Sequence, residues 1–211
     1  MTGTSQRPGL LLIISSPSGA GKSTLCDRLR RQEEDRVWMS VSATTRPRRS
    51  SEVDGQDYFF VSRQQFERMA ENGEFLEHAE VFGNLYGTPR EAVEARLAAG
   101  TDVLFDIDWQ GAAQIRRNSV GYLVVSIFIL PPDLNALEDR LRRRAQDDEE
   151  TVQFRMSRAR EEIAHWSEYD YVLVNEDLDS CFRRLSAVVT AERIRADRDG
   201  PVRVLAESML A

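Results

Sequence analysis

The sequence predicts a three-layer α/β fold, in which a parallel β-sheet lies between two layers of helices. Four apolar runs, at 10–15, 102–106, 122–130 and 171–174, are typical of buried strands. Stretches of helical periodicity alternate with them, which is typical of βα units in a parallel sheet covered on both faces. With 211 residues, of which 41% are hydrophobic, the chain suits one such domain with inserted parts.

The expected helices have recognisable ends. Pro89 lies near the first turn of a helix, and Gly100 follows the last turn of the same helix. Pro131 and Pro132 end a strand, after which Asp133 is expected to cap a helix that runs to about Arg144. The predicted helices span 22–33, 63–71, 89–99, 109–117, 133–144, 148–165 and 177–195.

The alternation of strands and helices is interrupted after a strand expected at 38–42. Residues 43–56 lack a helical period, and Pro47 keeps them extended. Short strands are expected at 58–61 and 75–81. Gly83, Asn84 and Gly87 mark turns. We therefore expect a compact insertion of short strands within the larger domain.

Residues 16–24 carry the strongest functional signal, and they directly follow the first apolar run. They read Ser-Pro-Ser-Gly-Ala-Gly-Lys-Ser-Thr, which predicts a phosphate-binding loop, or P-loop, at 16–23. Gly19 and Gly21 allow backbone N–H groups to turn toward a phosphate, and the following helix adds its positive dipole end. Lys22 can reach the β- and γ-phosphates, and the Ser23 hydroxyl can bind Mg²⁺. Ser16 replaces the usual first glycine, a change that we expect to be tolerated; a plain glycine turn before a helix is the alternative.

Acidic and basic residues elsewhere fit phosphate chemistry. Asp106 ends an apolar strand, where it either helps to hold Mg²⁺ or caps the next helix. Arg46 and Arg49 flank Pro47, and with Tyr58 they form either a receptor for a phosphate dianion or a solvated basic loop.

Two further groups leave alternatives open. Glu77, with the hydroxyls of Ser42, Tyr86 and Thr88, could accept the two donors of a guanine edge and donate to its O6, although a lone strand glutamate is ordinarily a surface residue. A second group of arginines predicts either a mobile lid that neutralises a transferring phosphoryl group or a salt-bridged helix pair. Its members are Arg140, Arg142, Arg143, Arg144 and Arg155.

Composition narrows the class of protein. The net charge of −7 disfavours a protein that coats nucleic acid. Cys26 and Cys181 have no metal-type spacing, and two histidines make a histidine metal site improbable. No apolar stretch approaches membrane-spanning length. We expect a cytoplasmic protein without nucleic-acid or membrane partners, and its oligomeric state stays undetermined.

Together these motifs resemble the guanylate kinase family of the P-loop nucleoside monophosphate kinases, in its bacterial form, over about residues 8–195. The resemblance implies a P-loop kinase fold in three parts: a core, a GMP-binding region at about 41–88 and a helical lid at about 134–160, followed by a tail at 196–211. Besides the P-loop, the resemblance rests on five motifs. They are Ser-Val-Ser-Ala-Thr-Thr-Arg-Pro-Arg-Arg at 40–49, Glu52-x-x-Gly55-x-x-Tyr58-x-Phe60, Phe-Gly-Asn-Leu-Tyr-Gly-Thr at 82–88, Asp-Ile-Asp-Trp-Gln-Gly at 106–111 and Val-Asn-Glu-Asp-Leu at 174–178.

The resemblance also implies a role for each site residue. It assigns the guanine to Ser42, Glu77, Thr88 and Asp108, and the GMP phosphate to Arg46, Arg49, Tyr58 and Tyr86. It assigns ATP to Ser16, Pro17, Ser18, Gly19, Ala20, Gly21, Lys22, Ser23, Thr24 and Asn175, the last near the adenine. It assigns catalysis to Lys22, Arg46, Arg140, Arg144 and Arg155, with Mg²⁺ at Ser23 and Asp106 through water. Ala145 stands where the family usually has glycine, which is expected to stiffen the lid joint slightly.

The implied reaction is transfer of the γ-phosphoryl group of Mg-ATP to GMP, giving ADP and GDP. Two alternatives are a non-catalytic interaction module of the same fold and a kinase of another small phosphorylated metabolite. The intact Lys22 and Ser23, and a chain with no room for partner domains, are expected to disfavour the first. The set Ser42, Glu77 and Thr88 disfavours the second. A nucleic-acid-dependent ATPase is disfavoured by the acidic balance.

Overall fold

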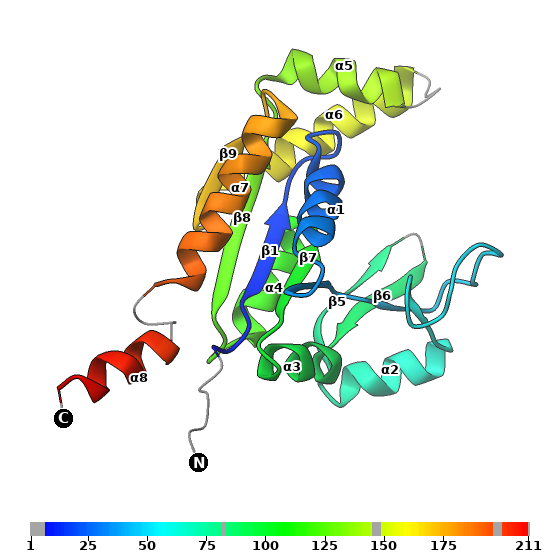
Figure 1. Ribbon diagram of the computed structural model, residues 1–211. Coiled ribbons are helices and arrows are strands. Elements are labelled where there is room, and N and C mark those ends of the chain that lie inside the picture. Colours follow the sequence, from blue (N-terminus) through cyan, green and yellow to red (C-terminus); the bar gives the residue numbers. More distant parts are fainter. Residues whose placement is uncertain (1–6, 82, 145–148, 196–199, 211) are drawn as a thin grey trace.

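Two β-sheets organise the chain (Figure 1). The structure, a computed structural model, describes residues 7–81, 83–144, 149–195 and 200–210, without the side chains of 143, 144, 150, 151 and 200. The larger sheet has five strands in the order β2-β7-β1-β8-β9, and every neighbouring pair is parallel. Its strands are β1 (Leu11–Ser15), β2 (Val37–Met39), β7 (Asp102–Asp106), β8 (Val124–Leu130) and β9 (Tyr171–Val174).

Alternate residues of β1 point to opposite faces of the large sheet. Leu12 and Ile14 pack in a core with α1 (Lys22–Gln32) and α7 (Leu178–Arg193). Leu11 and Ile13 pack in a second core with α3 (Arg90–Ala98) and α4 (Trp109–Asn118). A strand that is buried on both faces reads as a continuous apolar run, which is why this strand was recognisable in the sequence. The three-layer α/β prediction is confirmed.

The second sheet is formed by the segment between β2 and α3. Its order is β4-β3-β6-β5, and it contains both parallel and antiparallel pairs. The strands are β3 (Ala43–Thr44), β4 (Phe59–Phe60), β5 (Phe75–Val81) and β6 (Asn84–Pro89). The helix α2 (Arg63–Glu71) packs Phe66 against Phe75 and Ala43 in a small core of this sheet. The predicted insertion of short strands is therefore present.

Three details of this insertion differ from the sequence-based expectation. The strand expected at 38–42 ends at Met39, and Ala43 begins β3 of the other sheet. Gly83 lies in a turn with φ of 76°, as expected, but Asn84 and Gly87 belong to β6. Gly87 is needed for close packing, since an added Cβ would lie 2.9 Å from His78 Cβ and 3.0 Å from Phe66 Cζ.

Two helices beyond the large sheet pack on each other, α5 (Leu134–Arg144) and α6 (Glu149–Ile163), and both lie at the upper end of the molecule in Figure 1. As predicted, Asp133 caps α5, because its Oδ1 accepts the Ala136 N–H at 2.7 Å. A 3₁₀ turn, η1 (Trp166–Glu168), leads from α6 to β9. The apolar core shared by α5 and α6 consists of Leu137, Leu141, Val152, Met156 and Ala159.

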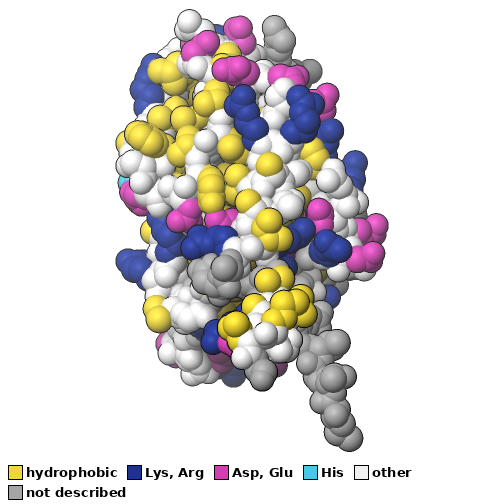
Figure 2. All heavy atoms as spheres, turned by 60° about the vertical axis from the view of Figure 1, so that its left-hand side comes forward, with side chains coloured by type: hydrophobic (Ala, Val, Ile, Leu, Met, Phe, Trp, Pro, Cys, Tyr) yellow, Lys and Arg dark blue, Asp and Glu magenta, His cyan; other side chains and the backbone are white. Residues whose placement is uncertain are grey.

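The tail forms α8 (Gly200–Ser208), where Val202, Val204 and Leu205 are exposed. Figure 2, which brings the left-hand side of Figure 1 forward, shows hydrophobic side chains gathered at the lower end of that face. Within the described residues, no helix is long and apolar enough to cross a membrane.

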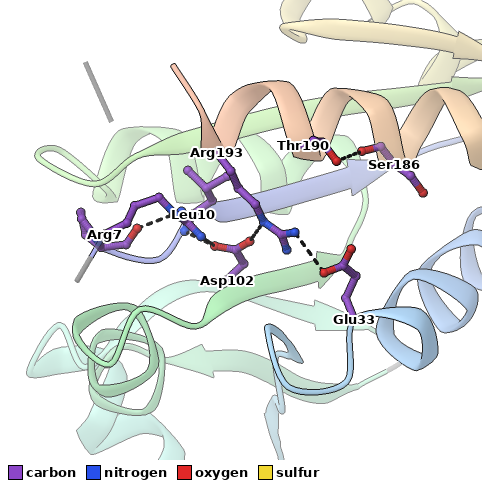
Figure 3. Close-up of polar contacts among 8 residues, drawn as sticks. Arg7, Leu10, Glu33, Asp102, Ser186, Thr190 and Arg193 are labelled. Carbon is purple, nitrogen blue, oxygen red and sulfur yellow. Dashed lines mark hydrogen bonds and ion pairs between the residues drawn. The ribbon is translucent and has the colours of Figure 1, made fainter. Parts of the chain in front are cut away.

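A buried carboxylate joins four segments at the end of the large sheet where β7 begins (Figure 3). Asp102 has no exposed side-chain surface. Its Oδ1 lies 2.7 Å from Arg7 Nη2 and accepts the Leu10 N–H at 2.8 Å, while its Oδ2 accepts from Arg193 Nε at 2.7 Å. Arg193 also donates to Glu33 Oε2 at 3.0 Å, just beyond α1. The N-terminal segment, β7, α1 and α7 are thus connected at one point.

Candidate active site

The predicted P-loop connects β1 to α1. Gly21 precedes the first residue of α1 and has φ of 98°, a left-handed conformation that favours glycine. The Ser16 side chain, which replaces the usual glycine, is buried and donates to Pro17 O at 2.9 Å, so its hydroxyl is satisfied within the loop. The loop encloses a hollow of about 230 Å³. Its lining residues are Ser16, Pro17, Ser18, Gly19, Gly21, Lys22, Ser23, Asp106, Asp108 and Glu162. Thr24 is exposed in the first turn of α1.

Asn175 holds the loop from the far end of the chain. Its side chain is buried, and its Nδ2 donates to Ala20 O at 2.7 Å. A Cβ on Gly21 would lie only 2.5 Å from that nitrogen, so the glycine is required by space as well as by φ. The Asn175 backbone carbonyl in turn accepts from Arg140 Nη2 at 3.0 Å, which ties α5 to the same point. The predicted contact of Asn175 with adenine stays a prediction.

Lys22 is directed toward the end of β7. Its Nζ forms an ion pair with Asp106 and donates to Ile107 O at 3.1 Å. The Ser23 hydroxyl and the Asp106 carboxylate line the same hollow, and both are the hard oxygen ligands that Mg²⁺ prefers. These residues could therefore hold a magnesium ion beside a bound phosphate.

Glu77 and Thr88 form a buried polar pair in the small sheet. They lie opposite each other on β5 and β6, and Thr88 Oγ1 donates to Glu77 Oε1 at 2.7 Å. Ser42 Oγ lies 3.4 Å from Thr88 Oγ1. Burial raises the pKa of the Glu77 carboxyl; the hydrogen bond from Thr88 opposes this, and the negative charge of Asp108 adds to it. The alternative of an ordinary surface glutamate is wrong, because only 8% of Glu77 is exposed.

Asp108 lies between the two parts of the site. Its Oδ1 accepts the Gly111 N–H at 2.9 Å and so caps α4, while the residue also lines the hollow of the P-loop. Its charge reaches Glu77. Asp108 therefore lines the P-loop hollow and lies within electrostatic range of the polar pair of the small sheet.

Arg46 is positioned by an acid and by aromatic rings. Its Nη2 lies 2.6 Å from Glu52 Oε1, and its guanidinium lies 5.4 Å from the centre of the Tyr58 ring. Tyr58 and Tyr86 pack edge to face at 6.0 Å. Arg49 is exposed, and its backbone N–H donates to Glu52 Oε2 at 2.8 Å. The guanidinium of Arg46 lowers the pKa of Glu52, and the Arg49 N–H lowers it further.

The arginines of α5 and α6 divide between the two sequence interpretations. Arg142 lies 2.6 Å from Glu138 Oε1 and 2.6 Å from Glu149 Oε2, which is the salt-bridged arrangement. The hydrogen bond from Arg142, with a smaller contribution from Gln153, lowers the pKa of Glu149 to about 2. Arg140 instead reaches Asn175 beside the P-loop. Arg155 is half-buried on α6. The Arg144 side chain and residue Ala145 lie outside the described residues.

Two site features were missed by the sequence reasoning. Glu162, in the last turn of α6, lines the P-loop hollow, and its Oε2 accepts the Ser18 N–H at 3.2 Å. Trp109, directly after Asp108, stacks on His165 with ring centroids 3.6 Å apart. Glu162 follows another glutamate in a highly charged helix, so nothing in the local sequence distinguishes it.

Comparison with known proteins gives a consistent result. The family model described as guanylate kinase matches residues 9–192. The chain is 58% identical over 192 residues to a guanylate kinase of Cereibacter sphaeroides, covering 91% of this chain and 90% of that protein. It is 55% identical over 195 residues to a guanylate kinase of Agrobacterium fabrum, covering 92% and 88%. The crystal structure of guanylate kinase from Anaplasma phagocytophilum superposes with a TM-score of 0.70 at 40% identity, covering 96% of this chain and 95% of that chain.

Proposed function

The chain belongs to the guanylate kinase family, and from that premise we propose that it transfers the γ-phosphoryl group of ATP to GMP, forming ADP and GDP. The observation that carries the proposal is the position of Asp108, which lines the P-loop hollow and acts electrostatically on the buried Glu77. A donor triphosphate in the hollow and an acceptor nucleotide at Glu77 would therefore lie side by side.

Guanine fits the polar set of the small sheet. Its N1–H and N2–H₂ would donate to the Glu77 carboxylate, which the Thr88 hydroxyl holds by a hydrogen bond at 2.7 Å, and the Ser42 hydroxyl can donate to its O6. Asp108 is the fourth residue that we assign to the base. Adenine would leave the buried carboxylate without its donors, an arrangement that sites of this kind reject strongly. Burial of Glu77 supports this role, since a buried carboxylate that has Thr88 as its donor is stabilised further when a ligand supplies more donors.

Arg46 and Arg49 are proposed to hold the phosphate of GMP, with the hydroxyls of Tyr58 and Tyr86. The position of Arg46 against Glu52 supports this, because the guanidinium already accommodates an anionic oxygen. Phosphate would take over the interaction that Glu52 makes in the free protein. The acceptor phosphate has a second pKa of about 6, so at neutral pH it needs no general base.

Transfer then depends on alignment and on charge stabilisation. We assign the stabilisation to Lys22, Arg46, Arg140, Arg144 and Arg155, and the donor phosphates to residues 16–24. Ser23 and Asp106 would hold Mg²⁺, the latter through water, and the ion when bound neutralises charge on the phosphates. Asn175 is proposed to lie near the adenine as well as under the loop.

Water must be kept away from the donor phosphate, since it competes with GMP as the acceptor. We propose that the GMP-binding region at about 41–88 and the lid at about 134–160 close over the substrates. The apolar core shared by α5 and α6 supports a lid that moves as a unit. We propose the cytoplasm as the site of action, where ATP and GMP occur and where the two free cysteines would stay reduced.

The test is formation of ADP from Mg-ATP when GMP, AMP, CMP and UMP are offered separately to the purified protein. Strong turnover with GMP alone is expected. Turnover with another acceptor would refute the guanine assignment. Binding of ATP without turnover on any of the four would favour a non-catalytic module or a kinase of another phosphorylated metabolite.

A further inference from the structure

A carboxylate of the protein occupies part of the phosphate-binding loop. In a P-loop the backbone N–H groups point inward and bind anions. Here the N–H of Ser18 donates to Glu162 Oε2 at 3.2 Å. Glu162 belongs to α6, 144 residues away in the chain, so this contact joins the loop to the pair of helices α5 and α6.

The charges of the hollow make this contact incompatible with a bound polyphosphate. Three carboxylates, of Asp106, Asp108 and Glu162, line the hollow together with Lys22. The Lys22 ammonium is already paired with Asp106. A nucleotide phosphate in the loop would compete for the same N–H group of Ser18, and its negative charge would repel the carboxylate of Glu162 at close range. Binding of the phosphates is therefore expected to displace Glu162 from the loop.

The environment of Glu162 fits a group poised between two positions. Burial raises its pKa and the charge of Asp108 adds to this, while the Ser18 N–H and Lys22 lower it. The carboxylate is only half-buried, so water can receive it when it leaves the loop. Its departure would be transmitted along α6 to the core shared with α5, the helix that carries Arg140.

We propose that Glu162 is a positioning residue of the reaction: its carboxylate fills an anion position of the empty P-loop and is displaced by the nucleotide phosphates, which couples loading of the loop to movement of α5 and α6. The proposal rests on the assignment of the P-loop to ATP. In this proposal Glu162 weakens nucleotide binding, and α5 and α6 move only when phosphate has displaced its carboxylate.

The direct test is calorimetric binding of ADP to Glu162→Gln. Glutamine keeps an acceptor oxygen for Ser18 N–H but removes the competing charge. The dissociation constant for ADP is expected to fall by roughly 3- to 10-fold, the value of one like charge in a partly hydrated site. The matched control is Glu161→Gln, which removes the same charge from the same helix. Glu161 is the exposed neighbour of Glu162 and accepts from Arg158 Nη1 at 3.1 Å. The affinity of this control for ADP is expected to stay within about twofold.

A purely structural role predicts the opposite sign, because a loosened loop would bind ADP more weakly. Unchanged or weaker binding by Glu162→Gln would overturn the proposal. If that variant does not fold, Glu162→Asp, which draws the carboxylate back by one methylene, must also bind ADP more tightly. Wild-type protein that binds no ADP would instead refute the P-loop assignment itself, so the two failures are distinguishable.

Discussion

Replacement of the buried carboxylate at the start of β7 is expected to cost more stability than any exposed ion pair of the molecule. Asp102 accepts from Arg7, Arg193 and the Leu10 N–H, and its own side chain is entirely buried (Figure 3). In Asp102→Asn the amide would place N–H donors against a guanidinium in either orientation. Two arginines would thus lose their shared anion, and one donor would face another donor.

The size of the loss follows from burial. Removing one partner of a buried ion pair costs about 3–5 kcal/mol when the remaining charge cannot reach water. The side chains of Arg7 and Arg193 are 17% and 11% exposed, so water partly compensates them. We expect a loss of about 2–4 kcal/mol, a large share of the roughly 5–15 kcal/mol that stabilises a typical domain.

Urea unfolding followed by circular dichroism measures this loss. The midpoint is expected to fall by roughly 1–2 M with an unchanged slope. Glu67→Gln is the matched control, because it breaks an ion pair with Arg63 in which both side chains are about half exposed; its effect should stay below about 0.5 kcal/mol. A loss of less than about 1 kcal/mol in Asp102→Asn would refute the reasoning, because it would mean that the two arginines are compensated without the carboxylate.

Three further predictions concern the site and its surroundings. Glu77→Gln should stabilise the ligand-free protein, because folding raises the pKa of the Glu77 carboxyl and the wild type therefore loses stability as the pH increases through that raised value. The gain in the urea midpoint of the variant over the wild type should be larger at pH 8 than at pH 5, and a smaller gain at pH 8 would contradict the assignment. In steady-state kinetics Arg46→Ala should raise the KM for GMP by roughly 100-fold with little change in the KM for ATP, whereas Arg63→Ala, at an exposed arginine, should change neither KM. Equal GMP kinetics in the two variants would refute the phosphate site. Cys26 and Cys181 are buried, which raises the pKa of both thiols, so iodoacetamide should label them only after unfolding; labelling of the native protein, detected by mass spectrometry, would show that the core opens.

The regular part of the fold could be predicted because its strands are buried on both faces. The run of five apolar residues from Leu10 to Ile14, four of which lie in β1, and the acid at the end of β7 are visible without any tertiary information. The short strand β3 could not be found, because two residues carry no period and their pairing depends on distant partners in β4 and β6. Gly87 was expected in a turn but lies within β6. The close approach of His78 and Phe66 requires a glycine there, and sequence spacing cannot reveal such an approach.

The site shows the same division. A motif such as the P-loop can be recognised in the sequence because its functional groups, backbone N–H groups included, belong to one short segment. The burial of Glu77 became visible only when Thr88 was placed opposite it across two strands. Glu162 reaches the loop from 144 residues away, and Asp102 gathers partners from both ends of the chain. Such contacts follow from topology, and no local pattern of residues encodes them.

The hydrogen bond from Asn175 to Ala20 has a consequence for the way in which the protein is made. The two residues are 155 positions apart, and Asn175 directly follows the edge strand β9, where its backbone N–H donates to Leu130 O at the end of β8. Contacts between such distant segments form late, since the intervening chain must first be ordered. A polypeptide growing on the ribosome would therefore contain the complete P-loop sequence long before the loop could bind a nucleotide. The contact of Asn175 with the loop can form only once residues 171–175 have docked against β8.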